Sequence, residues 1–284
     1  MALRVPTFEL PGHQLGVKAG LPGRPGVRFA LDTGVGITAF SADLLAGTGG
    51  SPSGTTFTGR RMSGQALTVP LAEVPWVEVG GRRFERVPVG MIDLAPFVVH
   101  LGPLAGILSL PFFQGAPITL DAAAQALTIE DEVSLAERER EGWSAGVEVE
   151  RDGPSEVLFL RLMLPRVGPV RVEVDTGSYS LILDRRFMSP LGMAEDDPAL
   201  RTRQGADETG HLYTRYSTRL SGAIYPDGLP EVRQVDPEVT FQEIIYDGLV
   251  GREFLDRQPV TYDPARSRIL FGRRSQPSAA GPPV

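Results

Sequence analysis

The chain has 284 residues, including 33 glycines, 25 prolines and no cysteine, and its formal net charge is −7. The lack of cysteine excludes disulfide bonds and thiolate catalysis, and the acidic balance with scattered arginines argues against a nucleic-acid partner. No apolar stretch is long enough to cross a bilayer, and the N-terminus lacks the charged and apolar regions of a signal peptide. We therefore expect a cytoplasmic protein with no nucleic-acid partner and no membrane partner.

Short apolar runs separated by Pro-Gly, Gly-Gly and Asp-Gly pairs fill the chain, whereas helical periodicity is scarce. Runs bounded by such turn residues are typical of strands and hairpins, so the sequence predicts a mostly β protein. Brief helical stretches are expected at residues 41–46 and 184–188 and around Phe112 and Phe254. The charged run at 130–142 is either a linker or a short exposed helix.

The tripeptide Asp-Thr-Gly occurs twice, each time at the end of an apolar run. Asp32 follows the run at 27–31 and Asp175 follows the run at 170–174, so each carboxylate is expected where a buried strand turns. One such tripeptide is a weak signal, since each residue type occupies on the order of one position in twenty. Repetition of the flanking sequence makes the signal specific.

That flanking sequence repeats with an offset of 142 to 146 positions. The pattern G-x-x-x-[ST]-G-x-x-x-T occurs at residues 59–68 and again at 205–214, and the apolar motif at 106–113 matches the one at 248–255. A repeat of this length indicates two tandem copies of one unit and is too long for a solenoid. The predicted organisation is an N-terminal lobe over residues 1–130, a charged linker over 131–145, a C-terminal lobe over 146–272 and a disordered tail over 273–284.

These motifs resemble the retropepsin-like aspartic proteases, over residues 5–130 and 146–272. The resemblance implies two homologous β-barrel lobes that form one bilobal unit with a central cleft. It implies an aspartic endopeptidase whose catalytic residues are Asp32 and Asp175, one from each lobe. Such an enzyme binds a polypeptide extended between its lobes and needs no metal or other cofactor. We expect it to act as a monomer, with a dimer as the alternative.

The chemistry of two neighbouring carboxyl groups fits this expectation. Ionising both groups is unfavourable, so the pair holds one proton between them. The ionised partner can take a proton from water while the protonated partner donates to the peptide carbonyl oxygen. The shared proton is the established behaviour of this family's carboxyl pair and is carried over with the resemblance.

The other residues of the two tripeptides have supporting roles. Gly34 and Gly177 lack a Cβ, which lets the two loops approach each other. The resemblance implies that Thr33 and Thr176 donate hydrogen bonds across to the opposite loop.

The residue after each tripeptide differs between the two halves. Ser178 follows the second one, and we expect its hydroxyl to bond Asp175 and make it the ionised base. Val35 offers Asp32 no such bond, so Asp32 would be the acid. Val35 departs from the family pattern, as does Ser109, which stands where the family usually has glycine.

The glycine-containing hairpins match the position of the family's flaps, which close over substrate. The candidate flap residues are Gly59 and Gly64 in the first half and Gly205 and Gly210 in the second. Plain turns explain such hairpins equally well.

Other chemistries have little support. The three histidines, His13, His100 and His211, lack metal-ligand spacing, and no G-x-S-x-G motif is present. The open alternatives are a silent, two-lobed peptide-binding pseudoprotease and a swapped dimer that pairs Asp32 of one chain with Asp175 of another. For an active enzyme, we expect broad cleavage between bulky apolar residues, not set by one charge.

Overall fold

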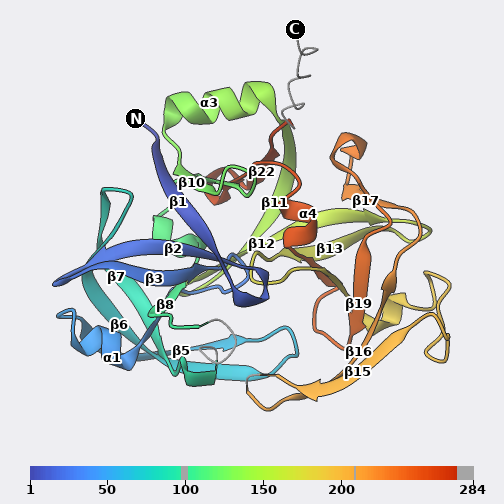
Figure 1. The fold of residues 1–284 in the computed structure, drawn as a ribbon, viewed down its shortest axis with the longest axis horizontal. Helices are drawn as coiled ribbons and strands as arrows, with labels where there is room; N and C mark the ends of the chain where they lie inside the picture. The colour runs from blue at the N-terminus through green and yellow to red at the C-terminus, as the bar shows by residue number, and fades with distance from the viewer. Residues whose placement is uncertain (97–101, 208, 274–284) are drawn as a thin grey trace, which may run out of the picture.

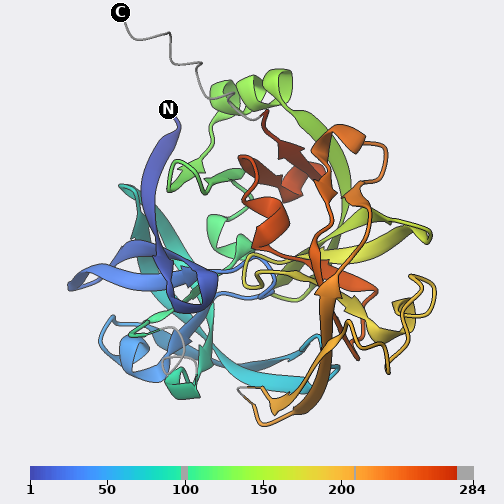
Figure 2. The same cartoon turned by 45° about the vertical axis from the view of Figure 1, so that its right-hand side comes forward.

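The computed structural model describes residues 1–96, 102–207 and 209–273 (Figure 1). His100 and the predicted tail beyond Arg273 lie outside these residues. The mostly β prediction is confirmed, because strands arranged in two lobes dominate the described chain (Figures 1 and 2). None of the described helices has the length and apolarity that a membrane crossing requires.

The first lobe is built from hairpins that alternate buried and exposed side chains. Its tight turns use residues suited to left-handed backbone, as at Gly80 (φ 62°) and Gly81 (φ 85°). Its elements are β1 (Leu3–Leu10), β2 (Gln14–Leu21), β3 (Arg24–Leu31), β4 (Ala39–Ser41), α1 (Ala42–Ala46), β5 (Ser51–Arg60), β6 (Ala66–Val79), β7 (Arg82–Ile92), β8 (Gly106–Leu108), a 3-10 turn (Leu110–Phe113), β9 (Ile118–Asp121) and β10 (Ala126–Ile129).

The second lobe follows α3 (Glu132–Glu141) and has a similar series of strands. Its elements are β11 (Trp143–Asp152), β12 (Ser155–Leu164), β13 (Gly168–Val174), β14 (Leu181–Asp184), a 3-10 turn (Arg185–Phe187), β15 (Arg201–Ala206), β16 (Leu212–Arg219), β17 (Ala223–Pro226), β18 (Gln234–Val235), β19 (Glu238–Gln242), β20 (Gly248–Val250), α4 (Arg252–Leu255), β21 (Val260–Asp263) and β22 (Arg268–Phe271).

The expected helical stretches are present as short elements. Residues 41–46 contain α1, residues 184–188 contain a 3-10 turn, and Phe112 and Phe254 lie in one-turn elements. The charged run forms a helix, α3, because Asp131 caps it by accepting a bond from the Ser134 N–H (2.8 Å).

Equivalent strand pairings place both Asp-Thr-Gly loops at the centre of the molecule. In the first lobe β3 runs parallel to β8, with Leu31 opposite Leu108, and in the second β13 runs parallel to β20, with Val174 opposite Val250. Each loop therefore starts at the end of a strand that is held on the core side by an apolar neighbour. A tandem duplication requires such pairings, but the duplication itself stays a prediction.

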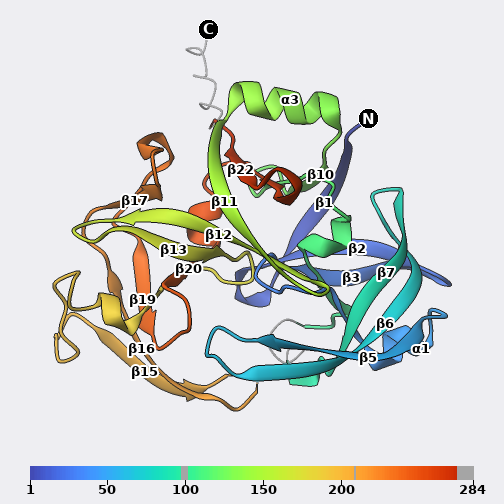
Figure 3. The same ribbon diagram turned by 180° about the vertical axis from the view of Figure 1, so that it is seen from behind.

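A sheet shared by both lobes holds them together. Its strands follow the order β1, β10, β9, β21, β22 and β11, and β9 pairs with β21 across the lobes. Within it the hydroxyls of Thr119 and Thr261 lie 2.7 Å apart. Helix α3 lies beside this sheet, with Glu139 ion-paired to Arg268 of β22 (Figures 1 and 3). This sheet fixes the two lobes relative to each other and so fixes the distance between their loops.

Candidate active site

The two Asp-Thr-Gly loops meet through a reciprocal set of hydrogen bonds. The Thr33 N–H donates to Thr176 Oγ1 and the Thr176 N–H donates to Thr33 Oγ1, both at 3.0 Å. The hydroxyls in turn donate to the opposite strands, Thr33 to the Val174 carbonyl (2.7 Å) and Thr176 to the Leu31 carbonyl (3.3 Å). Both threonines are buried, so these bonds satisfy groups that water cannot reach.

The glycines allow each loop to approach the other loop's carboxyl group. A Cβ on Gly34 would overlap the carboxyl group of Asp175, and a Cβ on Gly177 would overlap that of Asp32. Any larger residue at either position would push the two carboxyl groups apart. The structure therefore brings Asp32 and Asp175 together with all four of their Thr and Gly neighbours.

The first hairpin of each lobe contacts the loop of the other lobe. The Gln14 side chain of β2 donates to the Gly177 carbonyl, and the Glu156 N–H of β12 donates to the Gly36 carbonyl (2.9 Å). Sequence reasoning missed these contacts, since no local pattern indicates which loop a distant hairpin reaches.

The two carboxyl groups have different hydrogen-bond partners. Asp32 Oδ1 accepts bonds from the Gly34 N–H (2.9 Å) and the Val35 N–H (3.2 Å). Asp175 Oδ1 accepts one bond, from the Gly177 N–H (2.7 Å). Backbone donors stabilise the ionised form of a carboxyl group, so Asp32 is the better supported anion.

The pKa shifts agree with this asymmetry. Burial raises the pKa of Asp32, but its backbone donors and a hydrogen bond from Asp175 oppose the rise. Burial raises the pKa of Asp175 well above its usual range, and the negative charges of Asp32 and Glu173 raise it further. The shared proton therefore belongs on Asp175.

This result corrects the sequence-based assignment of the two aspartates. The expected bond from the Ser178 hydroxyl to Asp175 is wrong, because that hydroxyl donates to the Ser180 carbonyl (3.4 Å). Val35 also contributes more than expected, through its backbone N–H. The roles are thus reversed, with Asp32 as the ionised partner and Asp175 as the protonated one.

The unusual Ser109 of the first lobe has a buried partner. Its hydroxyl lies 3.1 Å from that of Thr38, and its N–H donates to Thr38 Oγ1 (3.4 Å). The corresponding residue in the second lobe, Gly251, has no room for a side chain, since a Cβ there would lie 2.6 Å from two backbone oxygens. The serine at position 109 is therefore accommodated by hydrogen bonds to Thr38, and it leaves the carboxyl pair intact.

We predict that Thr38 and Ser109 stabilise the fold as a pair. Thr38→Val and Ser109→Ala should each lower the free energy of unfolding by about 1–3 kcal/mol, because each leaves a buried hydroxyl without a partner. The double variant should lose less than the sum of the two, by about 0.5–2 kcal/mol. Urea unfolding of the four proteins measures this coupling, and additive losses would show that the hydroxyls do not interact.

The two glycine hairpins meet at their tips, where the cyan and orange ribbons adjoin (Figures 1 and 2). Thr209 Oγ1 donates to Gln65 Oε1 (2.7 Å), and Arg61 forms an ion pair with Asp207 (3.4 Å). Of the four candidate flap glycines, Gly64 and Gly210 lie at the turns, both with φ 82°, whereas Gly59 and Gly205 lie in β5 and β15.

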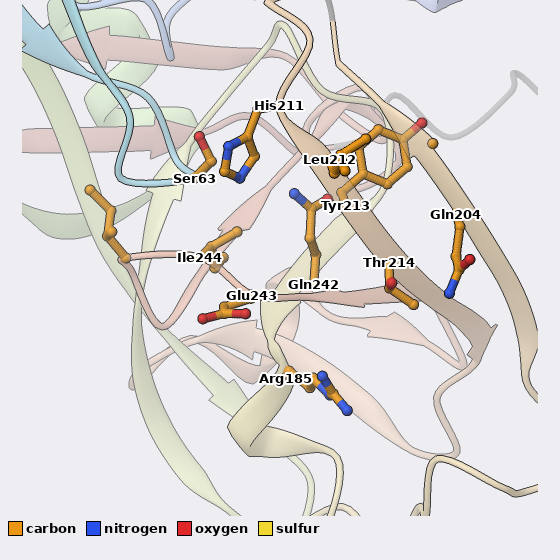
Figure 4. Close-up of a pocket in the computed structure, with 12 residues that line it drawn as sticks. Ser63, Arg185, Gln204, His211, Leu212, Tyr213, Thr214, Gln242, Glu243 and Ile244 are labelled. Atoms are coloured by element: carbon orange, nitrogen blue, oxygen red, sulfur yellow. The ribbon is translucent and has the colours of Figure 1, made fainter.

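A cavity of about 810 Å³ opens beside the second hairpin (Figure 4). Residues of β15 and β16, the segment 242–245, His211, and Ser63 from the first hairpin line it. Neither Asp32 nor Asp175 lines this cavity, so it is a side pocket. His13 lies elsewhere on the surface, 2.8 Å from Glu9.

Sequence reasoning also missed Glu173, a buried carboxyl group two residues before Asp175. A signal was available, because Arg171 and Glu173 alternate with valines in the run at 170–174 that leads into the tripeptide. Burial raises the pKa of Glu173 to about 8, and the negative charges of Asp32 and Glu150 add to the rise.

Two lobes of strands, each with an Asp-Thr-Gly loop at their junction, define the aspartic-protease class of fold. Residues 17–112 match the family described as aspartyl protease, and this match confirms the resemblance to the retropepsin-like aspartic proteases.

Solved structures support the same fold over the whole chain. Basic 7S globulin from soybean is similar with a TM-score of 0.58 and 10% identity, covering 96% of this chain and 95% of that one. Conglutin gamma, a basic 7S globulin from lupine seeds, is similar with a TM-score of 0.56 and 10% identity over the same shares. At this identity the likeness concerns the fold alone. No curated protein sequence matches the chain.

Proposed function

We propose that the protein is an aspartic endopeptidase that hydrolyses peptide bonds with a water molecule activated between Asp32 and Asp175. The observation that supports this most directly is the carboxyl pair itself, carried by two loops that reciprocal threonine bonds and closely approaching glycines hold together. The family match of the first lobe supports the same chemistry.

The asymmetry of the pair assigns the two catalytic roles. The ionised Asp32 takes a proton from the water while the water oxygen attacks the peptide carbonyl carbon. Asp175 donates its proton to the carbonyl oxygen in the same step. When the tetrahedral intermediate collapses, the C–N bond breaks and the proton on Asp32 passes to the leaving amine. Asp175 then recovers a proton from the hydroxyl that it had protonated. The products are a carboxylic acid and an amine, and the pair returns to its starting state.

The substrate that suits this site is an extended polypeptide held between the lobes. Both aspartates come from one chain, which favours a monomer as the active unit. The two hairpins meet on the far side of the lobes from the shared sheet and are suited to act as flaps that exclude water (Figure 1).

A peptide library tests this proposal. The purified chain should release new termini from unfolded peptides between about pH 3 and about pH 8, and a statine-containing peptide, which mimics the tetrahedral intermediate, should stop the release. A folded protein that binds these peptides without cleaving them at any pH would instead be the silent peptide-binding protein.

We predict that the ion pair between the hairpin tips helps to close the site. Burial tends to raise the pKa of Asp207, but bonds from Thr209 and the His211 N–H outweigh it and lower the pKa. Asp207 therefore stays charged in mildly acidic solution. Asp207→Asn keeps an oxygen acceptor for the turn but removes the charge facing Arg61. It should raise KM by roughly two- to fivefold, in line with a partly exposed pair, with a smaller effect on kcat.

Hydrogen exchange of the hairpin tips provides a second readout for that variant. The tips should exchange faster in Asp207→Asn than in wild type. The matched control is Asp227→Asn, which removes one partner of an exposed ion pair with Arg161 away from the hairpins. Equal exchange rates in wild type and both variants would show that the tip contact has no role in closure.

A further inference from the structure

Glu173 lies on the same face of β13 as the catalytic carboxyl group of Asp175. Val172 and Val174 on either side of it are fully buried in the hydrophobic core. Successive side chains of a strand point to opposite faces, so residues 171, 173 and 175 share the face away from that core. Glu173 itself keeps only 5% of its surface exposed.

Within the described residues, the carboxyl group of Glu173 has no hydrogen-bond partner and no ion pair, although its backbone is paired in the sheet. Its cross-strand neighbours are Phe159 of β12 and Leu249 of β20. The Tyr246 ring packs edge-on against Phe159 with centroids 5.2 Å apart. The Arg171 guanidinium is nearby but lies over the Phe159 ring and bonds other carboxylates. A buried carboxylate without a partner is unfavourable unless it is protonated or a ligand supplies the missing charge.

The other charged groups near Glu173 are mostly acidic. Asp32 and Glu150 act on it from the first-lobe loop and from β11, and Arg171 is the basic group that opposes them. Glu173 in turn acts on the titration of Asp175 and Tyr246. Glu148 and Glu150 accept bonds from Arg171 at 2.8–2.9 Å, so its positive charge is already matched. The surroundings of Glu173 therefore favour a cation and repel a substrate carboxylate.

The first lobe differs at the corresponding position. Ala30, two residues before Asp32, is buried in a small apolar cluster with Leu10 and Ile107, and Val35 packs against it. A small apolar residue thus precedes Asp32 at the position where a buried carboxyl group precedes Asp175.

We propose that Glu173 is a specificity-determining residue that binds the side chain of a lysine or arginine of the polypeptide substrate, on the second-lobe side of the scissile bond. This inference rests on the proposed function. Ala30 and its apolar neighbours then accept an apolar side chain on the other side of the bond. The proposal replaces the expected apolar preference with a preference for a basic side chain on the second-lobe side of the bond, and keeps the apolar preference on the other side.

The protonation of Glu173 makes this preference depend on pH. With a pKa of about 8 in the free protein, Glu173 carries a proton at neutral pH, and a bound ammonium or guanidinium group would release that proton. The preference for a basic side chain should therefore strengthen as pH rises from about 5 to about 8.

Matched peptides test the proposal. One series carries lysine, norleucine or glutamate directly before the scissile bond, and a second series carries them directly after it. In one series only, wild type should favour lysine over norleucine by roughly ten- to a hundredfold in kcat/KM, as expected for a buried bond to a charged group. Glu173→Gln should lose the preference, so that its kcat/KM values for the lysine and norleucine peptides become similar. The control Glu78→Gln, which alters an exposed carboxylate on β6, should keep it.

Binding measurements separate failure of this inference from failure of the proposed function. Statine-containing peptides with lysine or norleucine can be compared by calorimetry without any turnover. The lysine peptide should bind more tightly to wild type, with proton release, and Glu173→Gln or Glu173→Met should abolish both effects. Equal affinities for wild type, or an unchanged preference in the variants, would overturn the inference. Absence of cleavage with this binding pattern intact would overturn only the proposed peptidase activity.

Discussion

Replacing Asp32 or Asp175 with asparagine is expected to remove nearly all peptidase activity. Each change deletes one half of an acid–base pair, and such groups typically contribute about 10²–10⁴-fold each. Because the two act as a unit, the double variant should be no worse than either single one. The measurement is kcat/KM on a peptide that wild type cleaves. If one single variant kept wild-type turnover, the shared-pair mechanism would be wrong.

Two controls accompany these variants. Thermal unfolding should show that both remain folded, since asparagine avoids the unfavourable burial that raises the pKa of each carboxyl group. An equimolar mixture of Asp32→Asn and Asp175→Asn should stay inactive, because both aspartates of a site belong to one chain. Recovery of activity in the mixture would instead support the swapped dimer.

Replacing Glu173 with glutamine is expected to stabilise the folded protein in alkaline solution. In an unfolded chain a glutamate titrates near pH 4.3, whereas folding raises the pKa of Glu173 to about 8. Between these values the folded state binds more protons than the unfolded state, so stability falls as pH rises and stays low above about pH 8. A glutamine side chain does not titrate, so the variant does not lose stability in this way as the pH rises. The variant should gain roughly 2–5 kcal/mol over wild type near pH 9 and little near pH 4.

Urea unfolding of wild type, Glu173→Gln and Glu78→Gln at both pH values measures this effect. Glu78 is partly exposed, so its replacement should leave the pH dependence unchanged. The free energies of unfolding of wild type and Glu173→Gln could instead differ by the same amount at acid and alkaline pH. That result would show that folding does not shift the titration of Glu173.

Much of the fold and of the carboxyl pair could be predicted from the sequence. The Asp-Thr-Gly tripeptide occurs twice, each time with an apolar strand before it and a glycine hairpin after it. Because each tripeptide follows a buried strand, the positions of Asp32 and Asp175 at the strand ends could be predicted. The charged run illustrates the limit of such patterns, since the Asp131 cap decided between a linker and helix α3.

The finer electrostatics could not be predicted in this way. The rotamer of Ser178 decides whether its hydroxyl reaches Asp175 or the Ser180 carbonyl, and the sequence does not determine that choice. The backbone donors of Asp32 and the isolation of Glu173 depend on contacts between distant segments. These contacts reversed the acid and base assignments and revealed a buried carboxyl group near Asp175.

Titration of the site with a tight-binding statine peptide tests the central claim most directly. If one chain forms one site from Asp32 and Asp175, a single equivalent of inhibitor per chain should abolish cleavage, and both Asp→Asn variants should lose the activity being titrated. Complete inhibition at half an equivalent per chain would contradict one site per chain. Persistent cleavage with the inhibitor bound would contradict an active site at this carboxyl pair.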